Sequence, residues 1–184
     1  EAFDTVSYDE VYFNAFLGNQ GLEADLLANP VICFDGLTDQ VFGIENIYGT
    51  NFDDRILGDG ADNRFRGFGG DDFFNGRGGF DTVDYSRDAN RGDFTGIRAD
   101  LELGTVRDSY GADDILRKIE GIRGTQYRDV LRDDANDNYF RGGGGDDRIV
   151  LSQGDDDVEG NGGADTFIFR GNDIGSNYIA DFNA

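Results

Sequence analysis

Histidine, methionine and tryptophan are absent from this chain of 184 residues, and cysteine and proline occur once each. Without histidine the chain can form no Ser-His triad, no imidazole general base and no zinc site with imidazole ligands. A single cysteine cannot form an internal disulfide, and we interpret Cys33, in the apolar run Val31-Ile32-Cys33-Phe34, as a buried hydrophobic residue. No apolar run reaches the roughly 18 residues that span a bilayer, so we expect no transmembrane segment.

Positive charge is also scarce, because 38 acidic residues outweigh 16 basic residues and leave a formal net charge of −22. Nucleic acid and anionic membranes are therefore poor partners for this surface. The hydrophobic content of 38% is enough for a core, but the repulsion between carboxylates opposes a compact state. Oxygen-rich carboxylates select hard cations, so calcium is the expected counter-ion.

Glycine, by contrast, is abundant and regularly spaced. It occurs at positions 49, 58, 67 and 76, and a second block with the same spacing of nine starts at Gly124. Nine units fit this period. The sixth position of each unit holds Asp54, Asn63, Asp72, Asp81, Asp129, Asn138, Asp147, Asp156 or Asp165. The eighth position holds Ile56, Phe65, Phe74, Val83, Leu131, Phe140, Ile149, Val158 or Phe167.

The period also predicts a fold. Grouped glycines permit tight turns with positive φ, and the three residues around each apolar position suffice for a short strand. If one unit is half a coil, a full coil takes two units, and successive coils stack at about 4.8 Å. The eighth-position side chains then all point inward and form the core.

Three units show the pattern most completely: Gly-Phe-Gly-Gly-Asp-Asp-Phe-Phe-Asn at 67–75, Gly-Gly-Gly-Gly-Asp-Asp-Arg-Ile-Val at 142–150 and Gly-Asn-Gly-Gly-Ala-Asp-Thr-Phe-Ile at 160–168. They resemble the repeat-in-toxin (RTX) family of haemolysin-type calcium-binding repeats, with the consensus G-G-x-G-x-D-x-U-x. The resemblance covers about residues 40–85 and 115–170. It implies an all-β fold, a right-handed parallel β-roll or solenoid with calcium in its turns. It also implies type I secretion from a Gram-negative bacterium and folding outside the cell.

A longer repeat lies above the short one, because residues 25–83 match residues 100–158 at an offset of 75. We therefore divide the chain into a first copy at 1–84, with its nonapeptide block at 49–84, and a second copy at 85–184. The second copy contains a block at 124–168 and a closing cap at 169–184. The segments 10–40 and 87–114 are interpreted as longer coils of the same stack, and the alternative is separate caps over the core. Alternation of Ile97, Ala99, Leu101 and Leu103 with polar residues predicts a half-buried strand.

Calcium takes six to eight oxygens, and carboxylates one coil apart meet at the same edge of the roll. This predicts Asp54/Asp72, Asp129/Asp147 and Asp147/Asp165 on one edge and Asn63/Asp81 and Asn138/Asp156 on the other, with several Ca²⁺ ions bound. Carbonyl ligands are expected from the turn glycines Gly67, Gly69, Gly76, Gly78, Gly142, Gly144, Gly160 and Gly162.

Some positions depart from this pattern. Glu45 and Glu120 precede the two asparagines by one coil and form weaker sites, or pair with arginines or close the turn without metal. Asp133 and Leu151 replace the first-position glycine, and Ala61 and Asn136 replace the fourth, so those turns are predicted to be distorted or empty.

Three functions follow from different classes. The first is a calcium-dependent folding and secretion module of a larger secreted protein. The second is a polysaccharide-binding or cell-surface adhesion module, based on outward arginines that fork onto carboxylates or, alternatively, pair with local acids: Arg55, Arg64, Arg66, Arg132, Arg141 and Arg148. The third is catalysis by paired acids, which we reject because the metal lattice accounts for the well-placed aspartates.

Overall fold

The computed structural model describes residues 4–7, 21–28, 31–32, 38–87, 95–172 and 174–182. Within these ranges β-strands are the only regular elements, and no helix that could cross a membrane occurs there. Cys33 lies outside the described residues, and so do residues 10–20 of the segment 10–40. The expected burial of this cysteine therefore stays a prediction.

One sheet contains eight strands, and every neighbouring pair in it is parallel. In sheet order its strands are β1 (Thr5–Ser7), β5 (Asn46–Tyr48), β7 (Arg64–Arg66), β9 (Thr82–Asp84), β13 (Gly121–Arg123), β15 (Tyr139–Gly144), β17 (Asp157–Gly162) and β19 (Tyr178–Ile179).

The other sheet contains eleven strands and is parallel over both nonapeptide blocks. In sheet order its strands are β18 (Thr166–Phe169), β16 (Arg148–Leu151), β14 (Val130–Arg132), β10 (Arg98–Asp100), β11 (Thr105–Arg107), β12 (Asp113–Arg117), β8 (Phe73–Asn75), β6 (Arg55–Leu57), β2 (Glu23–Asp25), β3 (Val31–Ile32) and β4 (Thr38–Asp39).

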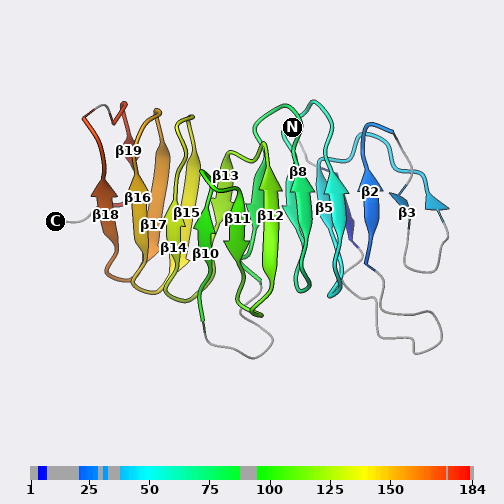
Figure 1. Ribbon diagram of the computed structural model, residues 1–184, viewed down its shortest axis with the longest axis horizontal. Helices are drawn as coiled ribbons and strands as arrows, with labels where there is room; N and C mark the ends of the chain where they lie inside the picture. Colours follow the sequence, from blue (N-terminus) through cyan, green and yellow to red (C-terminus); the bar gives the residue numbers. More distant parts are fainter. Residues whose placement is uncertain are drawn as a thin grey trace.

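Successive nonapeptides alternate between the two sheets, so the chain winds as a coil of two units. Arg55 pairs with Phe73 and Arg64 with Thr82, which is the predicted register of one coil. Figure 1 shows the strands side by side along the long axis, from β18 at one end to β3 at the other. The fold is the predicted parallel β-roll, and both sheets continue from one copy to the next through the pairs β9/β13 and β8/β12.

The core is the predicted ladder of eighth-position side chains. From Ile56 to Val158 these side chains are fully buried, and Phe167, near the C-terminal end of the stack, is partly buried against them. The rings of Phe65 and Phe74 stack with centroids 6.0 Å apart. Each fully buried side chain of this size stabilises the fold by about 2 kcal/mol, so the apolar ladder is the main metal-independent contribution.

The segment at 98–117 belongs to the stack, as expected for a long coil, but its strand directions were not predicted. Strand β10 pairs in parallel with β14, β11 returns antiparallel to β10, and β12 returns antiparallel to β11 before pairing in parallel with β8. The first copy repeats the start of this arrangement in β2, β3 and β4. The prediction for Leu103 was wrong, because residues 101–104 form the turn after β10 and leave Leu103 67% exposed.

Candidate calcium-binding turns

The sixth-position side chains form hydrogen-bonded ladders along the roll. In each predicted pair, the oxygen of the later residue accepts the backbone N–H of the sixth residue one coil earlier, at 2.8 to 3.0 Å. The structure therefore brings all five predicted pairs together: Asp54/Asp72, Asn63/Asp81, Asp129/Asp147, Asn138/Asp156 and Asp147/Asp165. All of these side chains except that of Asp165 are buried.

The first-position glycines are explained by the sixth-position side chain of the same unit. A Cβ at Gly142 would stand 2.7 Å from the carbonyl oxygen of Gly160 and closer still to Oδ2 of Asp147. The same carboxylate or amide oxygen faces the first glycine in the other units that have one. Glycine is needed there because the backbone and the carboxylate approach each other too closely for any side chain.

Replacing Gly142 with alanine should therefore destabilise the β-roll by about 1–3 kcal/mol, the usual penalty for overpacking. Gly78→Ala is the matched control, because the nearest atom to its Cβ would be the Cα of Gly60 at an ordinary 3.9 Å. Urea unfolding in calcium measures both variants. Equal stability of the two proteins would contradict the close approach described for Gly142.

The fourth-position glycines allow a conformation that other residues rarely adopt. Gly70, Gly79, Gly145 and Gly163 have φ between 93° and 126°. Two of the three units predicted to be irregular close their turns differently, because Asp59 and Asp134 accept the backbone N–H of Ala61 and Asn136, both at 2.8 Å. These two turns are thus held by a local side chain where glycine is missing.

The sixth-position residues fall into distinct groups by the hydrogen bonds they receive. Asp54 and Asp129 are fully satisfied, because a threonine at the second position of each unit donates its N–H at 2.6 Å and its hydroxyl at 2.9 or 3.0 Å. A further N–H, from Leu22 or Ile97, reaches each carboxylate at 2.6 Å. Both oxygens of each carboxylate therefore have donors, although burial still raises the pKa of Asp54 to about 6 and that of Asp129 to about 7.

The asparagines form the second group. Oδ1 of Asn63 accepts the N–H of Asp59, and Oδ1 of Asn138 accepts that of Asp134. The buried Nδ2 atoms of both amides have no hydrogen-bond partner, and a donor in this position does not favour a cation. These two side chains therefore contribute less to a metal site than the aspartates that follow them by one coil.

Asp81, Asp147 and Asp156 form the third group and fit calcium best. Each has a buried Oδ2 atom without any hydrogen-bond partner, and such an oxygen is strongly destabilising unless something compensates it. At Asp147, Oδ2 lies on the same side of Gly142 as the carbonyl oxygen of Gly160, and at Asp81 Oδ2 lies on the same side of Gly76 as the carbonyl oxygen of Lys118. A carboxylate oxygen without a donor, beside a backbone carbonyl oxygen on the same side of the turn, suits a cation with oxygen ligands.

No group of three acidic side chains that could hold a metal ion is found among the described residues. A calcium ion in these turns would therefore take much of its coordination from backbone carbonyls, as a flexible oxygen site permits. The predicted glycines lie suitably for this, since Gly76, Gly142 and Gly160 present carbonyl oxygens to the first-position glycine one coil earlier. Gly78 and Gly162 lie against glycines of the preceding coil, whereas Gly69 packs against the ring of Tyr110.

Burial raises the pKa of these carboxylates. It brings Asp81 and Asp147 to about 7 and Asp156 to about 6, and neighbouring acids such as Glu120, Asp129 and Asp133 add to the rise. Unfolded aspartates titrate near 3.9, so folding without a cation is opposed once these groups lose their protons. Calcium must displace the remaining protons as it binds.

These shifts predict an inverted pH dependence for the calcium-free chain. A raised folded-state pKa means that the folded state binds more protons than the unfolded state between about pH 4 and pH 7, so stability should fall as the pH rises through that window. Circular dichroism of metal-depleted protein between pH 4.5 and pH 7.5 measures this effect, because the β-sheet signal should fall as the pH rises. With saturating calcium the trend should reverse, because protons then compete with the metal. Calcium-free protein that becomes more stable toward pH 7.5 would contradict the assignment.

Further ladder positions were not predicted from the sequence. Fifth-position aspartates accept the backbone N–H one coil later, for example Asp53 from Asp71 at 2.9 Å and Asp146 from Ala164 at 2.9 Å. The signal was available, because six of the nine units carry this residue: Asp53, Asp62, Asp71, Asp137, Asp146 and Asp155. Fifth-position side chains thus form hydrogen bonds to the following coil, and sixth-position side chains form them to the preceding coil.

Three acids outside the nonapeptides continue the ladders. Asp114, in β12, accepts the N–H of Asp72 at 2.9 Å and the hydroxyl of Tyr85 at 2.8 Å, and burial raises its pKa to about 7. Glu120 accepts the N–H of Asp81 at 2.9 Å, and Glu45 accepts that of Asp4 at the same distance. The two glutamates therefore close the backbone between coils, and no ion pair with arginine is found for either within the described ranges.

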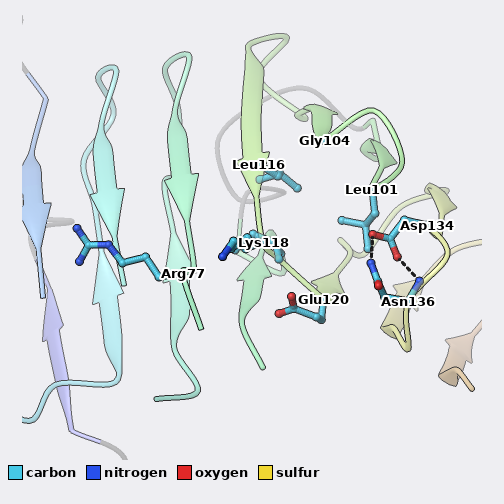
Figure 2. Close-up of a pocket in the computed structure, with 9 residues that line it drawn as sticks. Arg77, Leu101, Gly104, Leu116, Lys118, Glu120, Asp134 and Asn136 are labelled. Carbon is cyan, nitrogen blue, oxygen red and sulfur yellow. Dashed lines mark hydrogen bonds between the residues drawn. The ribbon is translucent and has the colours of Figure 1, made fainter. Parts of the chain in front are cut away.

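A hollow of about 470 Å³ lies beside the junction of the two copies, and Figure 2 shows residues that line it. Arg77 pairs with Asp25 at 2.7 Å, Glu120 accepts the N–H of Asp81, and Asp134 accepts both the backbone and side-chain N–H of Asn136. Because these polar groups already have partners, the hollow offers no converging set of ligands.

A β-roll with glycine-rich turns facing carboxylates belongs to the class of calcium-binding nonapeptide solenoids. The chain matches the family model of the RTX calcium-binding nonapeptide repeat (4 copies) over residues 48–83, 123–158 and 134–167. It is therefore a protein with RTX calcium-binding repeats, as the motifs predicted. No curated protein matches it in sequence.

Proposed function

We propose that the chain is a calcium-dependent folding module of a larger secreted bacterial protein. The observation that carries this proposal is the set of buried carboxylate oxygens without donors at Asp81, Asp147 and Asp156, stacked beside turn carbonyls in RTX repeats. When bound, calcium would supply the positive charge that these oxygens lack. Its binding free energy then adds to the folding free energy, because the unfolded chain has no such sites.

The same proposal covers localisation and role. The chain would leave a Gram-negative cell through a type I secretion system, unfolded where calcium is scarce, and fold at the cell surface or outside where calcium is abundant. Within this module the acids hold backbone N–H groups and cations and perform no chemistry on a substrate. Any catalytic activity would reside in the rest of the parent protein.

Calorimetric titration of metal-depleted protein with calcium tests the proposal. Several ions should bind, and the β-sheet circular dichroism signal should grow in step with the heat. The expected sites are those at Asp81, Asp147 and Asp156, with Asp72 and Asp165 as further ladder ligands. A chain that binds no calcium at millimolar concentration would show that the proposed function is wrong.

The second candidate, calcium-dependent binding of an acidic polysaccharide or cell surface, depends on arginines that are free to bind. Five of the six arginines predicted to face outward instead pair with local acids: Arg55 with Glu23, Arg64 and Arg66 with Asp84, Arg132 with Asp100, and Arg141 with Glu159. The prediction was wrong for Arg66, which is buried. Arg148 has no ion pair among the described residues. These six arginines therefore give polysaccharide binding little support, and another residue would have to bind the ligand.

A further inference from the structure

Arg123 is that residue, because it has a half-buried guanidinium without a counter-charge in a strongly acidic chain. It lies in β13 between β9, which carries Asp84, and β15, which carries Arg141. Asp84 is already paired with Arg64 and Arg66, and Arg141 is paired with Glu159 at 2.8 Å. Across the described part of the chain, the side chain of Arg123 makes no hydrogen bond or ion pair, although its backbone carbonyl accepts the N–H of Tyr85 at 2.8 Å.

The surroundings of Arg123 increase this imbalance. Burial lowers its pKa most, and the positive charge of Arg64 lowers it further; Asp84 opposes this effect, and Arg141 adds a smaller lowering. The Nε atoms of Arg64 and Arg141 are buried and have no hydrogen-bond partner. Three neighbouring guanidinium groups thus carry unused donors, and the chemistry that satisfies such donors is a carboxylate held by forked hydrogen bonds.

A hollow of about 210 Å³ opens beside Arg123 and Arg64 on the eight-stranded sheet. Thr82, Gly121 and Tyr139 stand in register on three neighbouring strands, and the side chain of Thr82 lies where a Cβ of Gly121 would stand. Phe80 and Tyr139 add aromatic surface to the lining, and Asn46 and Thr82 add polar groups. Asp62, the one acid that lines the hollow, accepts the N–H of Phe80 at 2.7 Å.

We propose that this hollow binds one carboxylate-bearing sugar ring, a uronate, with its carboxylate on Arg123 and Arg64. The volume suits a single ring, the aromatic residues suit its apolar face, and Asn46 and Thr82 can hydrogen-bond its hydroxyls. The proposal gives the second candidate function a specific site, and it does not rest on the calcium-binding turns. An extended acidic peptide is longer than a hollow of this size.

Nuclear magnetic resonance titration of the full chain with glucuronate tests the site. Calcium is saturating and constant throughout, because uronates bind calcium themselves. We expect the Arg123 Nε–H signal to shift, glucose to give no shift, and Arg123→Gln to weaken glucuronate binding at least tenfold. Arg148→Gln is the matched control, since it removes another unpaired arginine from the opposite sheet and should leave binding unchanged.

The outcomes separate this proposal from the calcium function. Arg123→Gln should keep the calcium titration and the circular dichroism spectrum of the parent, because no group in the described structure depends on the side chain of Arg123 as a partner. Equal binding of glucose and glucuronate, or equal weakening by the two substitutions, would overturn the site. Binding of a glutamate-rich peptide at Arg123 without glucuronate binding would overturn the sugar as its ligand. None of these results changes whether calcium folds the chain.

Discussion

Chelation of calcium at neutral pH is expected to abolish the β-sheet circular dichroism spectrum of this chain. Two ladders of buried acidic and amide side chains run along the roll, and Asp81 and Asp147 retain carboxylate oxygens that no donor reaches. At pH 7.5 these groups are largely ionised, so the folded state would hold uncompensated buried charge within a chain of net charge −22. The apolar ladder alone does not offset this repulsion.

Magnesium at the same concentration should not restore the spectrum. It requires a tight octahedron with ligands at about 2.1 Å and retains its water, whereas the turns offer backbone carbonyls and single carboxylate oxygens. The measurement is circular dichroism and thermal melting of chelated protein after calcium or magnesium is added back. A chelated chain with the spectrum and melting temperature of the calcium-loaded protein would exclude the folding role.

The nonapeptide period predicted the coil, the pairing register and the core, because a fixed spacing leaves one arrangement in which all apolar residues point inward. The alternation at 97–101 marked a strand but carried no information about its partner. Sequence alone therefore could not show that β11 runs antiparallel or that β12 bridges to β8. Such pairings are decided by non-local contacts between segments whose own sequences are compatible with several neighbours.

The motif also treats all sixth-position aspartates as equivalent, and the structure separates them. Asp129 and Asp147 are one coil apart in the same ladder, yet Thr125 satisfies the first while Oδ2 of the second has no donor. The distinguishing residue is at the second position of the unit, where threonine supplies a hydroxyl and glycine does not. Position within the repeat fixes where a carboxylate lies, and its neighbours decide whether it needs a metal.

Asp147 is consequently the position where a single substitution should affect calcium most. Its Oδ1 accepts the N–H of Asp129 at 2.8 Å, so alanine would remove both a ladder hydrogen bond and the proposed metal ligand. Asp147→Asn separates the two effects, because the amide oxygen can keep the hydrogen bond while the negative charge is lost. Asp157→Ala is the control, since this exposed residue of β17 belongs to no proposed site.

Calorimetric titration should show that Asp147→Asn and Asp147→Ala both lose about one bound calcium ion. We expect one ion because the carboxylate of Asp129 accepts hydrogen bonds, so that Asp147 and residues of the following coil hold the metal. Urea unfolding in calcium should place Asp147→Ala a further 1–3 kcal/mol or so below Asp147→Asn, because only alanine leaves the Asp129 N–H without an acceptor. Asp157→Ala should match the parent in both measurements. If Asp147→Asn bound as many ions as Asp157→Ala, the unpartnered oxygen would not be a calcium ligand, even in a chain that binds calcium elsewhere.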